Sequence, residues 1–226
     1  MVELTNRVAD AHVPAAVLWD MDGTLVDTEP YWIASEFELA ERHGGNWNRQ
    51  HALNIVGKDL LDAGRYIREH MAIDLTPERI VDELLDGVVG RVTQMVPWRS
   101  GARELLEELR TEGIPCALVT MSYRRFVDPI LAQLHPRTFR AVVTGEQLER
   151  GKPHPDPYLT AADALGVRPT ECLAIEDSNT GVASAIAAGC TVLVIPNHVT
   201  VAPGPGRVFR NTLADLTVRD LPALFA

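Results

Sequence analysis

Cysteine is scarce in this sequence, basic side chains are outnumbered, and no long apolar run occurs. The three cysteines, Cys116, Cys172 and Cys190, are widely spaced among 226 residues. Their small, odd number excludes a disulfide framework, and their spacing excludes a zinc site built on neighbouring thiolates. We therefore expect buried free thiols in a reducing compartment.

The lack of a long apolar run bears on localisation. No stretch is long enough to span a bilayer. Residues 1–12 carry Glu3 and Asp10 and contain no apolar core, so we expect no signal peptide there. The sequence predicts a cytoplasmic protein with no membrane partner.

The deficit of basic charge bears on partners. Lysine and arginine total 21 against 31 aspartates and glutamates, a net charge of −10. This balance argues against a nucleic-acid partner, because a phosphate backbone requires an extended basic surface. A small phosphorylated substrate remains compatible, since one metal ion and one lysine can reverse the field inside a pocket. We expect a monomer or a small homo-oligomer.

Short apolar runs alternate with helical patterns along most of the chain. This alternation predicts an α/β fold, a parallel sheet covered by helices on both faces. Ser100 and Ser178 are candidate N-caps of the first and last of these helices. The predicted strands are 15–19, 116–120, 141–144, 172–175 and 191–195, and the predicted helices are 102–111, 125–134, 156–165 and 180–188.

One segment interrupts the alternation. Residues 29–96 contain helical patterns but no convincing strand, with predicted helices at 31–42, 51–56, 60–70 and 77–95. We therefore predict an α/β core formed by residues 1–28 and 97–226, with a small α-helical cap domain, residues 29–96, inserted after the first strand. Near the end of the chain we expect a surface loop at 196–206, a strand or turn near Val208 and a short helix at 213–216.

Two carboxylates stand directly after the first predicted strand. Asp20 and Asp22 are separated by one residue, and Gly23 allows a sharp turn that presents both acids to one pocket. Such a concentration of like charge is costly unless a cation or a reacting phosphate uses it. The pattern indicates metal-assisted catalysis.

Polar residues also follow the other predicted strands. Thr120, Met121 and Ser122 come at the end of the second strand, Lys152 follows the third, and the pair Glu176–Asp177 ends the fourth. Parallel sheets bind ligands at the carboxyl ends of their strands, so we expect one common site.

These segments resemble the four motifs of the haloacid dehalogenase superfamily. They occur in order as Asp20-Met-Asp22-Gly-Thr24, Val119-Thr120-Met-Ser122, Gly151-Lys152-Pro153 and Ile175-Glu176-Asp177-Ser178. The sequence is most similar to the β-phosphoglucomutase-like branch, which combines a Rossmann-like core with a helical cap. The resemblance covers nearly the whole predicted core.

The resemblance implies a phosphatase that works through an aspartyl-phosphate. Asp20 is the implied nucleophile, and Asp22 is the implied acid that protonates the leaving alcohol and then activates water. Thr120 is expected to hold phosphoryl oxygens, while Lys152 neutralises the charge that Asp20 shares with the phosphate.

The resemblance also implies a Mg²⁺ site formed by Asp20, Asp22, Glu176 and Asp177, with Asp22 contributing its backbone carbonyl. Oxygen ligands and phosphate both suit this ion. Lys152 alone does not balance four carboxylates and a phosphate, which supports the need for the metal. Whether Glu176 touches the metal or acts through water stays open.

The remaining candidates are expected to contact the substrate. They are Thr24, Thr28, Trp32, Gly57, Lys58, Met121 and Ser122. Trp32 has two interpretations, ligand contact or packing inside the cap. It also occupies the position at which the related mutases carry a helper histidine, and their cap lysine and arginine fall near Val56 and Leu60.

Three functions are compatible with this pattern. The favoured one is Mg²⁺-dependent hydrolysis of a small phosphorylated metabolite, such as a sugar phosphate. A β-phosphoglucomutase-like sugar phosphomutase is the alternative enzyme, disfavoured by the missing cap groups. A non-catalytic phosphate-binding module is the alternative from another class, disfavoured because every catalytic side chain is present.

Overall fold

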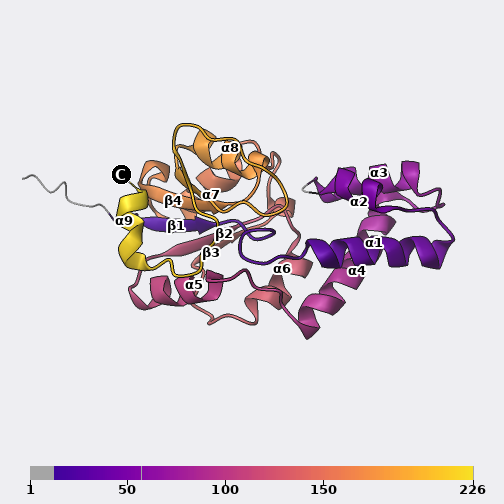
Figure 1. The fold of residues 1–226 in the computed structure, drawn as a ribbon, viewed down its shortest axis with the longest axis horizontal. Coiled ribbons are helices and arrows are strands. Elements are labelled where there is room, and N and C mark those ends of the chain that lie inside the picture. The colour runs from indigo at the N-terminus through magenta and orange to yellow at the C-terminus, as the bar shows by residue number, and fades with distance from the viewer. Residues whose placement is uncertain (1–12, 57, 226) are drawn as a thin grey trace, which may run out of the picture.

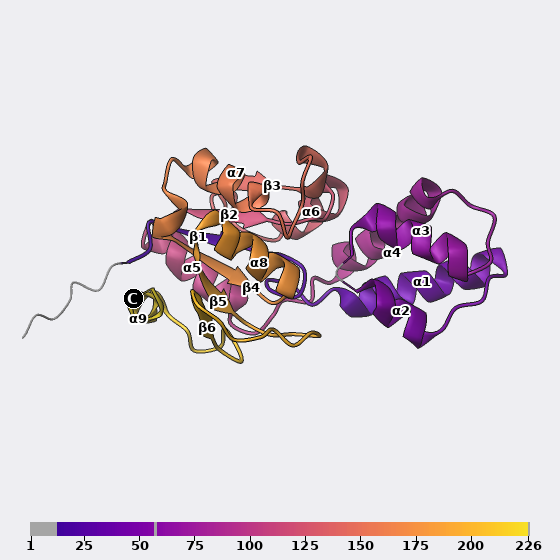
Figure 2. The same ribbon diagram turned by 90° about the horizontal axis from the view of Figure 1, so that it is seen from above.

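The computed structural model describes residues 13–56 and 58–225. Within them lies a parallel six-stranded sheet with the order β3-β2-β1-β4-β5-β6 (Figures 1 and 2). This confirms the predicted α/β fold. The strands are β1 (Ala16–Trp19), β2 (Cys116–Val119), β3 (Ala141–Val143), β4 (Cys172–Glu176), β5 (Thr191–Val194) and β6 (Arg207–Phe209). The predictions for residues 1–12 and for Gly57 fall outside the described residues.

Helices cover both faces of the sheet because both faces of its strands are apolar. Along β1, Val17 and Trp19 point to the face that carries α5 (Ala102–Thr111) and α6 (Arg124–Leu131). Ala16 and Leu18 point to the opposite face, under α7 (Asp156–Leu165) and α8 (Asn179–Ala188). In Figure 1, α5 lies on one side of the sheet and α7 and α8 on the other.

The chain leaves the sheet after β1 to form four helices that lie beside it, at the carboxyl ends of the strands (Figure 2). These are α1 (Glu29–His43), α2 (Arg49–Ile55), α3 (Leu60–His70) and α4 (Pro77–Gln94). They enclose an apolar cluster of their own, which includes Leu39, Trp47 and Ile67. Helix α4 also packs against α6, so this helical unit is anchored to the core.

Two details of the sequence prediction are wrong. Ser100 is not the N-cap of α5, because that position is occupied by Gly101. Gly101 has φ of 83°, and a Cβ there would lie 2.2 Å from the Leu213 carbonyl, so only glycine fits. Residues 213–216 form a turn rather than a helix. Helical structure begins later, at η3 (Val218–Asp220) and α9 (Leu221–Leu224), after a capping box at Thr217.

Other local predictions are confirmed. Ser178 caps α8, with its side chain accepting a hydrogen bond of 3.1 Å from the Gly181 backbone N–H. Two further 3₁₀ turns are η1 (Gly145–Gln147) and η2 (Pro169–Glu171). The three cysteines are buried free thiols, and burial raises the pKa of each to about 12. Among the described residues, none of the helices has the length and apolarity needed to cross a membrane.

Candidate active site

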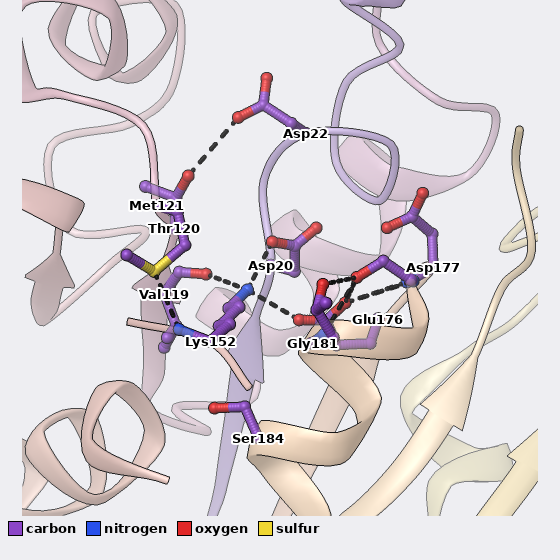
Figure 3. Close-up of polar contacts among 12 residues, drawn as sticks. Asp20, Asp22, Val119, Thr120, Met121, Lys152, Glu176, Asp177, Gly181 and Ser184 are labelled. Atoms are coloured by element: carbon purple, nitrogen blue, oxygen red, sulfur yellow. Dashed lines mark hydrogen bonds and ion pairs between the residues drawn. The ribbon is translucent and has the colours of Figure 1, made fainter. Parts of the chain in front are cut away.

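Asp20 and Lys152 form the centre of the site. Asp20 directly follows β1, and Lys152 lies on the loop between η1 and α7. Lys152 Nζ lies 2.6 Å from Asp20 Oδ1 and donates a second hydrogen bond, of 3.0 Å, to the Val119 carbonyl (Figure 3). The Lys152 side chain is 5% exposed and that of Asp20 10%. The lysine is thus held against one oxygen of the Asp20 carboxylate.

Glu176 forms a second ion pair with Lys152. Its Oε1 lies 2.7 Å from Lys152 Nζ and accepts a hydrogen bond of 2.6 Å from the Tyr158 hydroxyl. Its Oε2 accepts hydrogen bonds from the backbone N–H groups of Asp177 and Ser178 and from the Ser178 hydroxyl. Burial disfavours charge on Lys152, but the two carboxylates outweigh burial and raise the pKa of its ammonium. Lys152 therefore stays charged.

Asp20 Oδ2 and Asp177 offer oxygens to a cation. Asp20 Oδ2 is buried and has no hydrogen-bond partner among the described residues. One oxygen from each of Asp20, Glu176 and Asp177 lies within 4.8 Å of the others. Burial, followed by the Glu176 charge, raises the pKa of Asp20 to about 7, and burial with the Asp20 charge raises that of Asp177 to about 9. This excess of buried negative charge, with one orphaned oxygen, fits a hard divalent cation such as Mg²⁺.

Asp22 belongs to a second hydrogen-bond network. Its Oδ1 accepts a hydrogen bond of 2.7 Å from Thr28, and its Oδ2 accepts one of 2.6 Å from Ser122 and a longer one from Thr120. Burial raises the pKa of the Asp22 carboxyl, and these donors partly oppose the rise. In Figure 3 the Asp22 carboxylate lies on the Thr120 side, apart from the contact between Asp20 and Lys152. The two acids therefore occupy different environments.

Two glycines make room for the acids. A Cβ at Gly181, in the first turn of α8, would lie 1.9 Å from Glu176 Oε1. A Cβ at Gly23 would lie 2.1 Å from Asp177 Oδ2, and Gly23 also has φ of 88°. Any side chain at either position would displace a carboxylate of the site.

A cavity of about 620 Å³ opens above Asp20, between the sheet edge and the helices that follow β1. Its size suits a small-molecule ligand. Most predicted site residues line it: Asp20, Asp22, Thr28, Trp32, Lys58, Thr120, Met121, Ser122, Lys152 and Asp177. Glu176 is fully buried beneath the cavity and does not line it.

Thr24 is not brought to this cavity. Its side chain is fully buried, and its Oγ1 finds no hydrogen-bond partner among the described residues. The backbone N–H groups of Thr24 and Leu25 both donate to the Met21 carbonyl, which closes a turn with Thr24 inside it. The prediction that Thr24 contacts the substrate is wrong in this arrangement. Trp32 lines the cavity, packs against the apolar cluster of α1 to α4, and also lies edge-on against Phe126 of α6, with ring centroids 5.5 Å apart. Its contact with a ligand stays a prediction.

Sequence reasoning missed several residues of the site. Tyr158 is fully buried in α7, in a segment for which the sequence predicted only a helix. Its hydroxyl, on an otherwise apolar helix face, was the available signal. Glu29 and Glu36 line the cavity from α1, and their spacing of seven residues places them on one face of that helix.

Comparison with known proteins agrees with this geometry. The family model described as haloacid dehalogenase-like hydrolase matches residues 17–195. The chain belongs to this family. The predicted resemblance to the superfamily, and the predicted hydrolase, are thereby confirmed.

Individual proteins and solved structures also resemble this chain. Hexitol phosphatase A of Escherichia coli (strain K12) is 36% identical over 190 residues, which are 79% of this chain and 81% of that protein. Hexitol phosphatase B of the same organism is 29% identical and covers 93% of this chain and 94% of its own length. The crystal structure of CbbY from Rhodobacter sphaeroides in complex with phosphate has a TM-score of 0.82 at 24% identity, covering 92% of this chain and 99% of that one. This last likeness concerns the fold.

Proposed function

We propose that this protein is a Mg²⁺-dependent phosphatase that hydrolyses a small sugar or sugar-alcohol phosphate through an aspartyl-phosphate on Asp20. The observation that carries the proposal is the asymmetric environment of the Asp20 carboxylate. Lys152 holds Oδ1, whereas Oδ2 has no hydrogen-bond partner among the described residues, below a cavity of about 620 Å³. A carboxylate oriented by one oxygen and accessible at the other suits attack on phosphorus.

The neighbouring groups supply the rest of the chemistry. Lys152 neutralises charge that Asp20 shares with the phosphoryl group. Thr120 and Ser122 line the cavity on the side of Asp22 and donate hydrogen bonds to it, which orients its carboxyl. Asp22 protonates the leaving alcohol and, once ionised, takes a proton from the water that attacks the aspartyl-phosphate. Burial keeps the pKa of Asp22 above its ordinary value, which supports the acid role.

The metal would be held by Asp20 and Asp177 through their side chains and by Asp22 through its backbone carbonyl. When bound, Mg²⁺ supplies positive charge to the phosphoryl oxygens and helps orient the substrate. Glu176 has a different role in this proposal. Both of its oxygens already accept hydrogen bonds, so it positions Lys152 instead of occupying the coordination shell.

Residues 29–96 act as a cap that excludes water and selects the substrate, while residues 1–28 and 97–226 form the catalytic core. Trp32, Val56 and Leu60 line the cavity on the cap side and provide no cation for a second phosphate. These three positions therefore give the mutase alternative no support, and Lys58 is the cation that lines the same side of the cavity. The names of the hexitol phosphatases support a polyhydroxylated substrate. We further propose that the protein is cytoplasmic, has no membrane partner and is a monomer or a small homo-oligomer.

Phosphate release from a panel of sugar phosphates, sugar-alcohol phosphates, nucleotides and short organic phosphates tests the proposal. We expect turnover with Mg²⁺, loss of turnover after chelation, and recovery when Mg²⁺ is returned. The Asp20→Asn variant should be folded and inactive on every substrate. Tight phosphate-ester binding without any release would favour a binding module, and conversion of β-glucose 1-phosphate without free phosphate would favour a mutase.

A further inference from the structure

Glu36 is a buried acid in the wall of the cavity and lies on α1, outside the four catalytic motifs. Only 3% of its surface is exposed, and the residue lies two turns into α1. Trp47 Nε1 donates a hydrogen bond of 2.9 Å to its Oε2. Within the described residues, Oε1 accepts no hydrogen bond and no cation pairs with the carboxylate. Burial raises the pKa of Glu36 to about 7.

A buried carboxyl without a counter-charge is costly, and the hydrogen bond from Trp47 offsets only part of that cost. Ile55, Ala63 and Leu84 line the same part of the cavity with apolar surface. The group is nevertheless oriented, because Trp47 belongs to the apolar cluster of the cap and fixes one of its oxygens. An oriented, half-satisfied acceptor in a cavity wall is a recognition element for a hydrogen-bond donor on a ligand.

The charges around Glu36 limit which donor fits. Glu29 lies on the same face of α1, and Asp59 lines the cavity from the start of α3. On the cap side of the cavity, Lys58 is the one cation among the described lining residues, and its Nζ lies 5.1 Å from the centre of the Tyr66 ring. A second phosphate or a carboxylate at this end of the substrate would meet like charge, whereas neutral hydroxyl groups would meet acceptors.

We propose that Glu36, held by Trp47, accepts hydrogen bonds from hydroxyl groups at the unphosphorylated end of the substrate. The enzyme therefore selects monophosphates of neutral polyols or sugars over phosphate esters that carry a second anion. Glu36 is a specificity residue that contacts the substrate away from the reacting phosphate. This inference rests on the proposed phosphatase function and deepens it.

The position of Glu36 adds a length requirement. Thr28, at the beginning of α1, bonds to Asp22 beside the reacting centre. Glu36 lies eight residues further, which is about 12 Å along a helix axis. A short phosphate ester that fills only the catalytic end of the cavity leaves Glu36 without a contact. Longer polyol chains should therefore gain most from this residue.

The test compares kcat/KM for two substrates in four variants. One substrate is a hexitol 6-phosphate, and the other is p-nitrophenyl phosphate, which has no hydroxyl to offer. For the hexitol phosphate, we expect Glu36→Gln to lower kcat/KM about 10-fold and Glu36→Leu about 100-fold, mainly through a higher KM. For p-nitrophenyl phosphate, kcat/KM should change less than about threefold in either variant. Trp47→Phe, which keeps an aromatic ring but removes the indole N–H donor, should resemble Glu36→Gln. Glu41→Gln, an exposed position on the same helix, is the matched control.

Other results would overturn the inference. Equal losses on both substrates would indicate that Glu36 only supports the cap. A wild-type preference for an ester with a terminal carboxylate would contradict the charge argument. Failure of the proposed function is distinguishable, because wild-type protein would then hydrolyse neither substrate. In that case, calorimetric binding of the hexitol phosphate to Asp20→Asn, with and without Glu36→Gln, still tests the contact, and equal affinities would refute it.

Discussion

Glu176 Oε1 lies 2.7 Å from Lys152 Nζ, and the same oxygen accepts a hydrogen bond from the Tyr158 hydroxyl. This geometry makes Glu176 a positioning residue for the lysine. We predict that Glu176→Gln lowers kcat about 100-fold, because Lys152 loses a charged partner and its fixed orientation. The Mg²⁺ concentration for half-maximal activity should rise much less in this variant than in Asp177→Asn. Magnesium titrations of activity in both variants measure the difference, with Tyr158→Phe as the milder control.

An equal loss of magnesium affinity in Glu176→Gln and Asp177→Asn would show that Glu176 is a direct ligand. Tyr158→Phe preserves the Glu176 charge and removes one hydrogen bond. It should reduce kcat by less than about tenfold and the free energy of unfolding by about 2 kcal/mol.

A methyl group at Gly181 should disable the enzyme although it lies on a helix. Alanine normally stabilises a helix relative to glycine by roughly 1 kcal/mol. At Gly181, however, the Cβ would lie 1.9 Å from Glu176 Oε1 and would push that carboxylate away from Lys152. We expect Gly181→Ala to lower both the melting temperature and kcat.

Gly90→Ala is the matched control for this prediction. Gly90 lies inside α4, and a Cβ there would meet nothing within 4 Å. This variant should keep full activity and unfold at a slightly higher temperature. Wild-type activity in Gly181→Ala would mean that the position of Glu176 does not control the reaction.

Glu36 should make stability depend on pH. Burial raises its pKa from 4.5 to about 7 in the folded state, so its contribution is fully present below pH 4.5 and is lost as the pH rises through 7. Glu36→Gln removes this loss and keeps an acceptor for Trp47. We expect the variant to gain on the order of 2 kcal/mol over wild type at pH 8 and much less at pH 5. Guanidinium unfolding of wild type and Glu36→Gln at both pH values measures this gain in the free energy of unfolding. Glu41→Gln is the control variant. The same gain at both pH values would contradict the assignment.

The strand ends were predictable because the rule that places them is local. A buried run followed by an acid identifies where a parallel strand stops, and the carboxyl ends of β1 and β4 are neighbours in this sheet. Asp20, Lys152 and Asp177 could therefore be grouped from the sequence. The contact between Tyr158 and Glu176 could not, because helical periodicity indicates that Tyr158 is buried but not which polar group it meets.

The prediction failed where a side chain's direction depends on tertiary contacts. Thr24 stands beside the catalytic acids in sequence, yet the turn closed on Met21 buries it. Glu36 follows the pattern of an ordinary helix position, and only the packing of Trp47 against it creates a buried acceptor. Gly101 replaced Ser100 as a cap because the distant Leu213 backbone approaches it.

Direct trapping of phosphate on Asp20 tests the central claim. In the Asp22→Asn variant, p-nitrophenyl phosphate should still transfer its phosphoryl group to Asp20, because its leaving group needs no acid. Hydrolysis of the aspartyl-phosphate should slow, because the variant lacks the base that activates water. Acid quenching followed by peptide mass spectrometry should then find a base-labile phosphate on Asp20. The double variant, Asp20→Asn with Asp22→Asn, should carry no such phosphate. Continued release of phosphate by the double variant, together with no phosphate on Asp20 in the Asp22→Asn variant, would contradict the account.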